Sequence, residues 1–203
     1  TVLLGSLRPF AEVGYYSAAA RLVEFFYLIP TALILSVYPL MSVFSKKSKK
    51  QLLKTYDLSY RYLVFIGIPI TCGIFTLSQH ITLSFYGTEL LPSAEVLAIL
   101  SFSLPIIFVN TLFASILNAL DKQKIVGVTT ALNAILNVVS NLVLIPILGY
   151  NGAAVSTVLT ELLGFFTGYY FVSKYLGSHL SLGVLPKPIL CSLLMAAIVW
   201  AVH

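Results

Sequence analysis

Long apolar stretches follow one another along this chain and are separated by short polar connections. A helix of about 20 apolar residues spans the hydrocarbon core of a bilayer, because each residue adds about 1.5 Å to a core about 30 Å thick. The pattern therefore predicts an all-α fold, a polytopic bundle of about six membrane-spanning helices. We expect these spans at residues 14–44, 58–77, 94–119, 125–148 and 153–175, with the last one beginning near Pro188.

Composition supports this interpretation and excludes a soluble domain. Hydrophobic residues make up 59% of the chain and charged residues only 9%, whereas a soluble domain carries about 25% charged residues. The net charge of +5 does not indicate a nucleic-acid partner, because the basic residues lie in the short connections between apolar stretches. No nucleic acid is therefore expected among the partners of this protein.

The distribution of lysine and arginine predicts an orientation in the membrane. Basic residues concentrate at 45–57, 121–124 and 174–188, while Arg8 is the one that can belong to the opposite side. Because basic connections stay in the cytoplasm, we expect these three loops to be cytoplasmic. The chain is then a multi-pass protein of the cytoplasmic membrane.

Two neighbouring stretches carry polar and small residues at the spacing of a single helix face. Such groups cannot face lipid, where nothing would pair with them, so both faces should look at other helices or at a water-filled cavity. We take that inner surface as the candidate functional site. The residues are Thr130, Asn133, Asn137, Ser140 and Asn141 in the first stretch, and Ala153, Thr157, Glu161, Gly164 and Gly168 in the second.

Four further polar residues are candidates for the same inner surface. Asn110 and Asn118 lie in the stretch 94–119, and Arg21 and Glu24 lie three residues apart in the first stretch. The charged pair either forms an internal ion pair that lets the helix insert, or lines a cavity and meets an anionic substrate or a coupling ion. Each asparagine either contacts a substrate or forms a hydrogen bond between helices. Pro30 predicts a bend in the first stretch, which is longer than a bilayer requires.

No motif for covalent chemistry is present. The chain has no phosphate-binding Walker loop, no GxSxG or HExxH sequence and no Cys/His cluster. We therefore expect a protein that is not an enzyme, with no catalytic residue, no cofactor and no metal site.

The ordered motifs resemble the polysaccharide flippases of the multidrug/oligosaccharidyl-lipid/polysaccharide exporter superfamily. One position departs from the pattern, since a glycine is usual where this chain has Asp121. The resemblance covers nearly the whole chain, and it rests on Val13-Gly14-Tyr15-Tyr16-Ser17-Ala18-Ala19 with Arg21, Tyr38-Pro39-Leu40-Met41-Ser42, Tyr86-Gly87 before Ser93-Ala94, Asn118-Ala119-Leu120 with Lys122 and Lys124, and Asn137, Asn141, Ile145-Pro146, Gly149, Gly152-Ala153-Ala154, Thr157 and Glu161.

The resemblance implies a MATE-like transporter built from two pseudo-symmetric six-helix lobes and a terminal pair of helices. Residues 1–175 would form the second lobe from the end of its first helix. Residues 176–203 would form a cytoplasmic connection and the start of an additional terminal transmembrane helix. The first lobe of the same polypeptide, which supplies half of the central cavity, would lie outside this chain.

The implied function is the flipping of a polyprenyl-linked oligosaccharide across the cytoplasmic membrane for polysaccharide biosynthesis. In that interpretation Arg21 meets the lipid phosphate, Glu24 and Glu161 are ion-coupling acids, and the asparagines contact sugar hydroxyls. Expected partners are membrane lipids, the lipid-linked oligosaccharide, and a glycan polymerase or glycosyltransferases. The asparagines concerned are Asn110, Asn118, Asn133, Asn137 and Asn141.

Three alternatives stay open on the sequence alone. A cation-coupled multidrug exporter and a peptidoglycan-precursor flippase are relatives within the same superfamily. A non-transporting membrane scaffold of a glycan-assembly complex belongs to a different class. The polar ladder and Glu161 favour transport over scaffolding but do not choose among substrates.

Overall fold

The computed structural model describes residues 2–177 and 182–202, and every regular element in them is a helix. The first long stretch and the third are each divided into two helices. The elements are α1 (Val2–Leu7), α2 (Phe10–Phe25), α3 (Leu28–Lys47), α4 (Lys49–Tyr86), α5 (Ser93–Ser101), α6 (Ser103–Ala119), α7 (Gln123–Leu148), α8 (Tyr150–Leu176), the 3-10 turn η1 (Leu182–Val184) and α9 (Pro186–Val202).

The predicted helical membrane bundle is confirmed. Among the described residues four helical segments are long and apolar enough to cross a membrane, and the bent pair α5–α6 makes a fifth. The sixth expected stretch corresponds to α9, whose apolar part, Pro186–Val199, is shorter than a full span. The four segments are Phe10–Lys47, Lys49–Tyr86, Gln123–Leu148 and Tyr150–Leu176.

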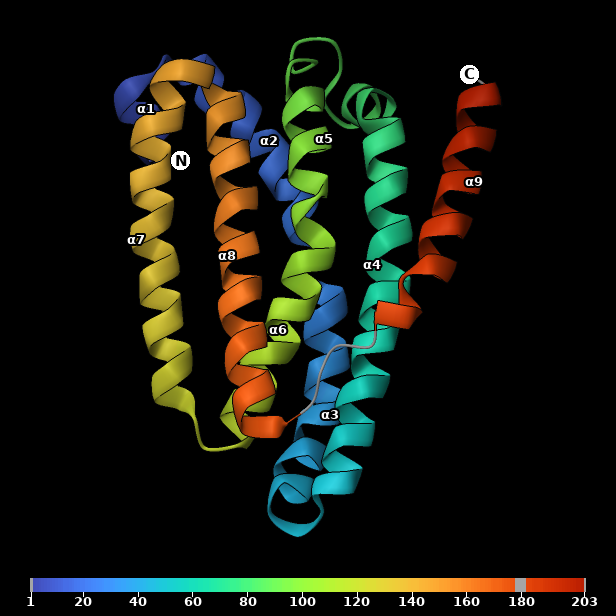
Figure 1. Cartoon of the computed structure of the whole chain (residues 1–203). Coiled ribbons are helices and arrows are strands. Elements are labelled where there is room, and N and C mark those ends of the chain that lie inside the picture. The colour runs from blue at the N-terminus through green and yellow to red at the C-terminus, as the bar shows by residue number, and fades with distance from the viewer. Residues whose placement is uncertain (1, 178–181, 203) are drawn as a thin grey trace.

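The long helices lie side by side, and their connections collect at two ends (Figure 1). The α3–α4 and α6–α7 connections and the end of α8 lie at one end, at the bottom of the view. The α4–α5 and α7–α8 connections lie at the opposite end, together with α1. Two of the basic connections and the beginning of the third thus share one end of the bundle, while the start of α9 lies further up beside α4 (Figure 1). The assignment of that end to the cytoplasm stays a prediction.

The basic stretch 45–57 is not the loop that the sequence suggested. Only Ser48 separates α3 from α4, and its hydroxyl accepts a hydrogen bond from the Gln51 main-chain N–H at 3.4 Å. Helix α4 has 38 residues and is therefore about 57 Å long, well beyond the thickness of a hydrocarbon core. The lysines lie on helix ends because helical geometry continues past the membrane boundary, where a solvated helix also satisfies its own main chain.

The predicted bend near Pro30 is present as a break between α2 and α3 at Phe26 and Tyr27. A proline inside a helix lacks an N–H and its ring clashes with the carbonyl four residues earlier, which here belongs to Phe26. Pro30 itself lies in the first turn of α3, where a proline is tolerated.

A second break, which the sequence analysis did not predict, bends the α5–α6 pair by 43° at Phe102. Pro105 has no N–H to donate to the Ser101 carbonyl. The Thr71 hydroxyl of α4 lies 3.0 Å from that carbonyl oxygen and also 3.0 Å from the Gly67 carbonyl oxygen, so its one hydrogen is shared between the two acceptors. A Cβ added at Gly67 would come within 3.2 Å of Pro105, so the glycine eases this close approach of α4 to α6.

Helix α6 forms the centre of the bundle. Leu104, Phe108, Leu112 and Ile116 are fully buried, and α6 packs against α3, α4 and α8. Helix α7 lies at the edge, is mostly exposed, and contacts chiefly α8. The polar face of α7 is therefore held against one neighbour while its apolar face is left for lipid or for other protein.

The geometry of the α6–α7 hairpin explains how Asp121 can stand where a glycine is usual. The main-chain N–H of Lys122 donates to the Leu117 carbonyl at 2.9 Å, and that of Asp121 donates to the Asn118 carbonyl at 3.1 Å. This pair of bonds is the Schellman motif, whose left-handed residue is usually glycine. Asp121 occupies that residue with φ of 58°, a conformation that aspartate tolerates better than most residues do.

Candidate functional site

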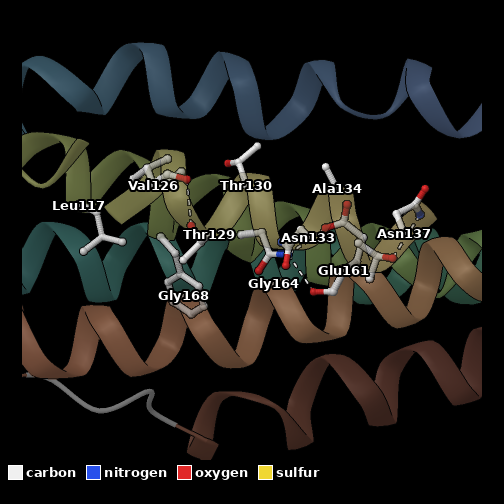
Figure 2. A pocket seen from close by; sticks show the side chains of 14 residues that line it. Leu117, Val126, Thr129, Thr130, Asn133, Ala134, Asn137, Glu161, Gly164 and Gly168 are labelled. Atoms are coloured by element: carbon white, nitrogen blue, oxygen red, sulfur yellow. Dashed lines mark hydrogen bonds between the residues drawn. The ribbon is translucent and has the colours of Figure 1, made fainter. Parts of the chain in front are cut away.

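A polar cleft of about 450 Å³ opens between α6, α7 and α8 (Figure 2). Most of its lining is polar or small, and Glu161 is the one ionisable residue among the lining residues. The cleft brings together the ladders that the sequence placed on α7 and α8. Its polar and glycine residues are Asn110, Thr129, Thr130, Asn133, Asn137, Thr160, Glu161, Gly164 and Gly168.

The carboxylate of Glu161 is held by Asn110 from the neighbouring helix. The Asn110 Nδ2 group donates to Glu161 Oε2 at 2.8 Å and to the Glu161 main-chain oxygen at 3.0 Å. The Oδ1 atom of Asn110 is buried and has no hydrogen-bond partner among the described residues. The ion pairs of the described residues, Arg8–Glu12 and Arg61–Asp57, lie elsewhere, so no side-chain cation within this part of the chain pairs with Glu161.

Gly164 lets two amides approach α8 one turn after Glu161. A Cβ at Gly164 would lie 2.6 Å from Asn133 Nδ2 and 3.2 Å from Asn110 Nδ2. Figure 2 shows Asn133, Glu161 and Gly164 grouped in the middle of the cleft. Two amides from two helices therefore converge on the turn of α8 that carries the acid.

Gly168 allows a similar approach further along α8. A Cβ there would lie 2.7 Å from the Phe113 ring of α6. Gly164 and Gly168 thus both lie where a neighbouring helix approaches α8 closely. A side chain at either residue would push α8 away from α6 and widen the cleft.

The asparagines of α7 differ in how they are bonded. Asn137 Nδ2 donates to the Thr160 hydroxyl of α8 at 3.2 Å, and Asn141 Nδ2 donates to Asn137 Oδ1 at 2.9 Å. The Asn133 side chain makes no hydrogen bond within the described parts of the chain and lines the cleft. Asn137 and Asn141 thus bond to protein, whereas Asn133 keeps its donors and acceptor available.

Arg21, Glu24 and Asn118 do not join the cleft. Arg21 and Glu24 are exposed on α2. Both lie in the described part of the chain, and no ion pair joins them. The internal ion pair considered from the sequence is therefore not formed, because i, i+3 spacing permits a contact without requiring it. Asn118 is half-buried in the last turn of α6 and does not line the cleft.

Two residues near the polar ladder were missed by the sequence analysis. Thr160 is buried and bonds both to Asn137 and to the Ser156 carbonyl, at 3.2 Å and 2.8 Å; its spacing of four from Gly164 could have placed it on the same face. The Tyr16 hydroxyl lies 3.2 Å from the Thr157 hydroxyl. Nothing in the local sequence pairs these two, because their contact depends on how α2 packs on α8.

Long apolar helices with a polar cleft between them define this chain as a polytopic helical membrane protein. Residues 6–203 match the protein family described as lipid II flippase MurJ, and the chain belongs to this family.

Three curated relatives match the chain at low identity. The probable low-salt glycan biosynthesis flippase Agl15 of Haloferax volcanii is 24% identical over 199 residues, covering 98% of this chain and 42% of that protein. The probable flippase AglR of the same organism is 31% identical over 176 residues, 81% of this chain and 35% of that protein. The lipid II flippase MurJ of Bacillus subtilis is 27% identical over 174 residues, 84% of this chain and 32% of that protein.

A solved structure shares the fold. Lipid II flippase MurJ in an inward closed conformation superposes with a TM-score of 0.78 at 20% identity, covering 95% of this chain and 41% of that one. At this identity the likeness shows the fold alone. The chain spans less than half the length of each of these relatives and of this structure.

Proposed function

We propose that this chain is part of a transporter that flips a polyprenyl-linked oligosaccharide across the cytoplasmic membrane for polysaccharide biosynthesis. The observation that carries the proposal is the polar cleft around Glu161, Asn110 and Asn133 in a bundle that exposes many large apolar side chains on its outside. A glycan head group loses its hydrogen bonds to water when it enters hydrocarbon. A polar path between helices removes that penalty while the lipid tail stays in the bilayer. The similarity to Agl15, a probable flippase of glycan biosynthesis, supports a glycan substrate.

A second candidate substrate is the peptidoglycan precursor. It is favoured by the description of the family to which the chain belongs. Both substrates consist of a sugar head group linked through phosphate to a polyprenyl chain, so the polar cleft suits either one. They differ in the consequence of gene loss, which should be lethal for a peptidoglycan precursor flippase and should alter surface glycans for a polysaccharide flippase.

The proposed arrangement makes residues 1–175 the second lobe of a two-lobed transporter. The share of each relative that this chain covers, between 32% and 42%, supports a larger protein with a further lobe. Lobes that rock about a central cavity would present the head group first to the cytoplasm and then to the outside. The end shared by two of the basic connections and the beginning of the third supports a cytoplasmic location for that end.

Within this lobe the residues have distinct proposed roles. Asn110 and Asn133 contact sugar hydroxyls, because each has amide atoms that no protein group satisfies. Glu161 is the coupling acid, since a carboxylate without a cationic partner at this depth is neutralised by a proton or a bound cation during transport. Arg21 meets the lipid phosphate, and Glu24 is a second coupling candidate. Asn118, Asn137 and Asn141 are secondary contacts of the same pathway.

The experiment uses a strain deleted for the full-length gene. Membrane lipids are extracted, lipid-linked oligosaccharide is quantified, and the leaflet that holds it is determined with a membrane-impermeant reagent. The proposal expects accumulation on the cytoplasmic leaflet, reversed by the intact gene and not by Glu161→Gln. The matched variant Glu89→Gln, in the exposed connection between α4 and α5, should restore export fully.

The outcomes separate the alternatives. Full export with Glu161→Gln would remove this acid from the mechanism. Normal lipid intermediates with changed drug sensitivity would indicate a multidrug exporter. Silent substitutions throughout the cleft, with a defect for Gly164→Leu, would indicate a scaffold that only packs against its partners.

A further inference from the structure

A pocket of about 540 Å³ opens beside the connection between α4 and α5. Its walls come from α4, from that connection, from the start of α5 and from the first residue of α8, which meet at the same end of the bundle (Figure 1). It shares no lining residue with the polar cleft around Glu161, and the proposed flipping of a glycan does not involve it. Small-molecule sites have volumes of about 300–1,000 Å³, so this pocket has the size of a ligand site.

Small side chains on α5 create this space. Ala94 and Ala98 lie four residues apart on α5 and line one wall, with no side-chain atom beyond Cβ. Phe75 and Gln79, also four residues apart, line the wall that α4 forms. The two helices pack against each other, so a large side chain at Ala98 would fill the pocket.

Glu95 gives this pocket a negative charge. Asn151 Nδ2 donates to Glu95 Oε2 at 2.9 Å, and this bond positions the carboxylate without neutralising it, because an amide is uncharged. Within the described residues no lysine or arginine forms an ion pair with Glu95. The neighbouring segments add no such base either, since residues 79–95 and 147–153 contain neither lysine nor arginine. A cleft with charge of one sign attracts ligands of the opposite sign, so this pocket favours a cation.

Two aromatic rings line the same pocket and are held by neighbouring rings. Phe75 of α4 packs edge-to-face with Phe102, and Tyr150 of α8 packs in the same way with Tyr15, at 5.3 Å and 5.7 Å between ring centroids. Phe75 still has half of its surface exposed. The face of an aromatic ring attracts a cation within about 6 Å. The rings and the carboxylate therefore favour the same kind of ligand.

We propose that this pocket binds an organic ammonium group, with its charge on Glu95 and its methyl or methylene groups against Phe75 and Tyr150. A calcium or magnesium ion needs six or more oxygen ligands, supplied by several carboxylates, carbonyls or waters, whereas this pocket combines one carboxylate with aromatic, apolar and neutral polar side chains. Two sources carry an ammonium group, a soluble amine and the head group of a zwitterionic lipid. The chemistry of recognition is the same for both, and the experiment distinguishes them.

The test uses the full-length protein in a maltoside detergent. Choline and its uncharged carbon analogue, dimethylbutanol, are titrated separately, and binding is measured by saturation-transfer difference NMR. Choline should bind at least about ten-fold more tightly than the alcohol, because the two have nearly the same shape and differ in charge. Calcium chloride should displace choline no better than sodium chloride at the same ionic strength, since both act by screening alone.

A pair of glutamate variants tests the charge. Glu95→Gln keeps a side-chain oxygen that accepts the hydrogen bond from Asn151 and removes the negative charge. Its affinity for choline should fall about ten-fold, and the preference over the alcohol should disappear. The matched control is Glu89→Gln, in the same exposed connection but not in the lining of the pocket. This variant should bind choline as the parent protein does.

A pair of aromatic variants tests the walls. Phe75→Leu should weaken choline binding about three-fold. Tyr62→Leu should not, because Tyr62 is similarly exposed, at 53%, but lines a cavity between α3 and α4 that has no charged residue. Ala98→Trp fills the pocket and should abolish binding. A folding defect of Ala98→Trp does not decide the result, because Glu95 and Phe75 are exposed side chains whose variants leave the core unchanged.

Lipid competition identifies the source of the ammonium group. Displacement of choline by phosphatidylethanolamine, and not by diacylglycerol with the same chains, would support the proposal with a lipid head group as the ligand. Choline binding that neither lipid disturbs would support it with a soluble amine. Equal binding of choline and dimethylbutanol, full affinity in Glu95→Gln, specific displacement by calcium, or no binding of choline to the parent protein would each overturn the proposal.

Discussion

The guanidinium of Arg8 donates a hydrogen bond to the main-chain oxygen of Pro146 at 2.8 Å and another to that of Ile145 at 3.1 Å. These carbonyls belong to the last turn of α7, which is capped by Gly149 with φ of 60°. The Ile145 carbonyl also accepts the Gly149 main-chain N–H at 2.9 Å. A cation at a helix C-terminus bonds to the last carbonyls and complements the helix dipole. One side chain thus fastens the α1–α2 corner to the turn between α7 and α8.

Replacement of Arg8 by alanine should lower the apparent melting temperature of the full-length protein, with a loss of about 1–3 kcal/mol from hydrogen bonds to a charged donor. Arg61→Ala is the matched control, because Arg61 forms an exposed ion pair with Asp57, worth about 0.5 kcal/mol. Thermal unfolding in detergent measures both. Equal losses for the two variants would contradict a special role for Arg8.

Gly164→Ala should disturb the cleft more than the fold. The new Cβ would press on the ends of the Asn133 and Asn110 side chains, so these amides must move and the Asn110–Glu161 hydrogen bond weakens. We expect export to fall strongly with a stability loss of about 1 kcal/mol. Gly127→Ala on the same measurements should be harmless, since a Cβ at Gly127 has nothing within 4 Å. A fully active Gly164→Ala protein would show that the close approach is not needed for transport.

Thr71→Val removes the hydroxyl that donates a hydrogen bond to the Ser101 carbonyl, and it keeps the volume of the side chain. A buried carbonyl left without a donor costs about 1–3 kcal/mol, so this variant should melt earlier than the parent protein. Thr76→Val is the comparison, because the Thr76 hydroxyl bonds only to the Cys72 carbonyl of its own helix, at 2.7 Å. If both valine variants melt together, the break at Phe102 does not depend on Thr71.

Asp121→Gly should stabilise the α6–α7 hairpin. The positive φ of Asp121 is strained for a residue with a side chain, and relief of that strain contributes about 1 kcal/mol. Asp121→Ala keeps the strain and loses the tolerance of aspartate, so its melting temperature should fall. A higher melting temperature for both variants would instead point to the aspartate charge as the destabilising factor.

Much of the candidate site could be predicted from spacing because a helix face is a local property. The period of 3.6 residues placed Asn133 and Asn137 on one face of α7, and Glu161 with Gly164 on one face of α8. The break near Pro30 followed from the chemistry of proline. The break at Phe102 was not predicted, because Pro105 does not by itself require a break in the helix. The break also depends on a donor such as Thr71 for the freed carbonyl, and that donor comes from another helix.

The sequence by itself determined that this protein is a bundle of apolar helices with polar faces turned inward, since hydropathy and periodicity depend only on neighbours along the chain. Only the tertiary structure decided that Asn110, 51 residues before Glu161, holds that acid, and that Arg21 and Glu24 remain apart. It also decided that Asn137 bonds to Thr160 while Asn133 stays available. These outcomes depend on how helices pack and which rotamers fit between them, and spacing along one helix carries no information about its neighbours.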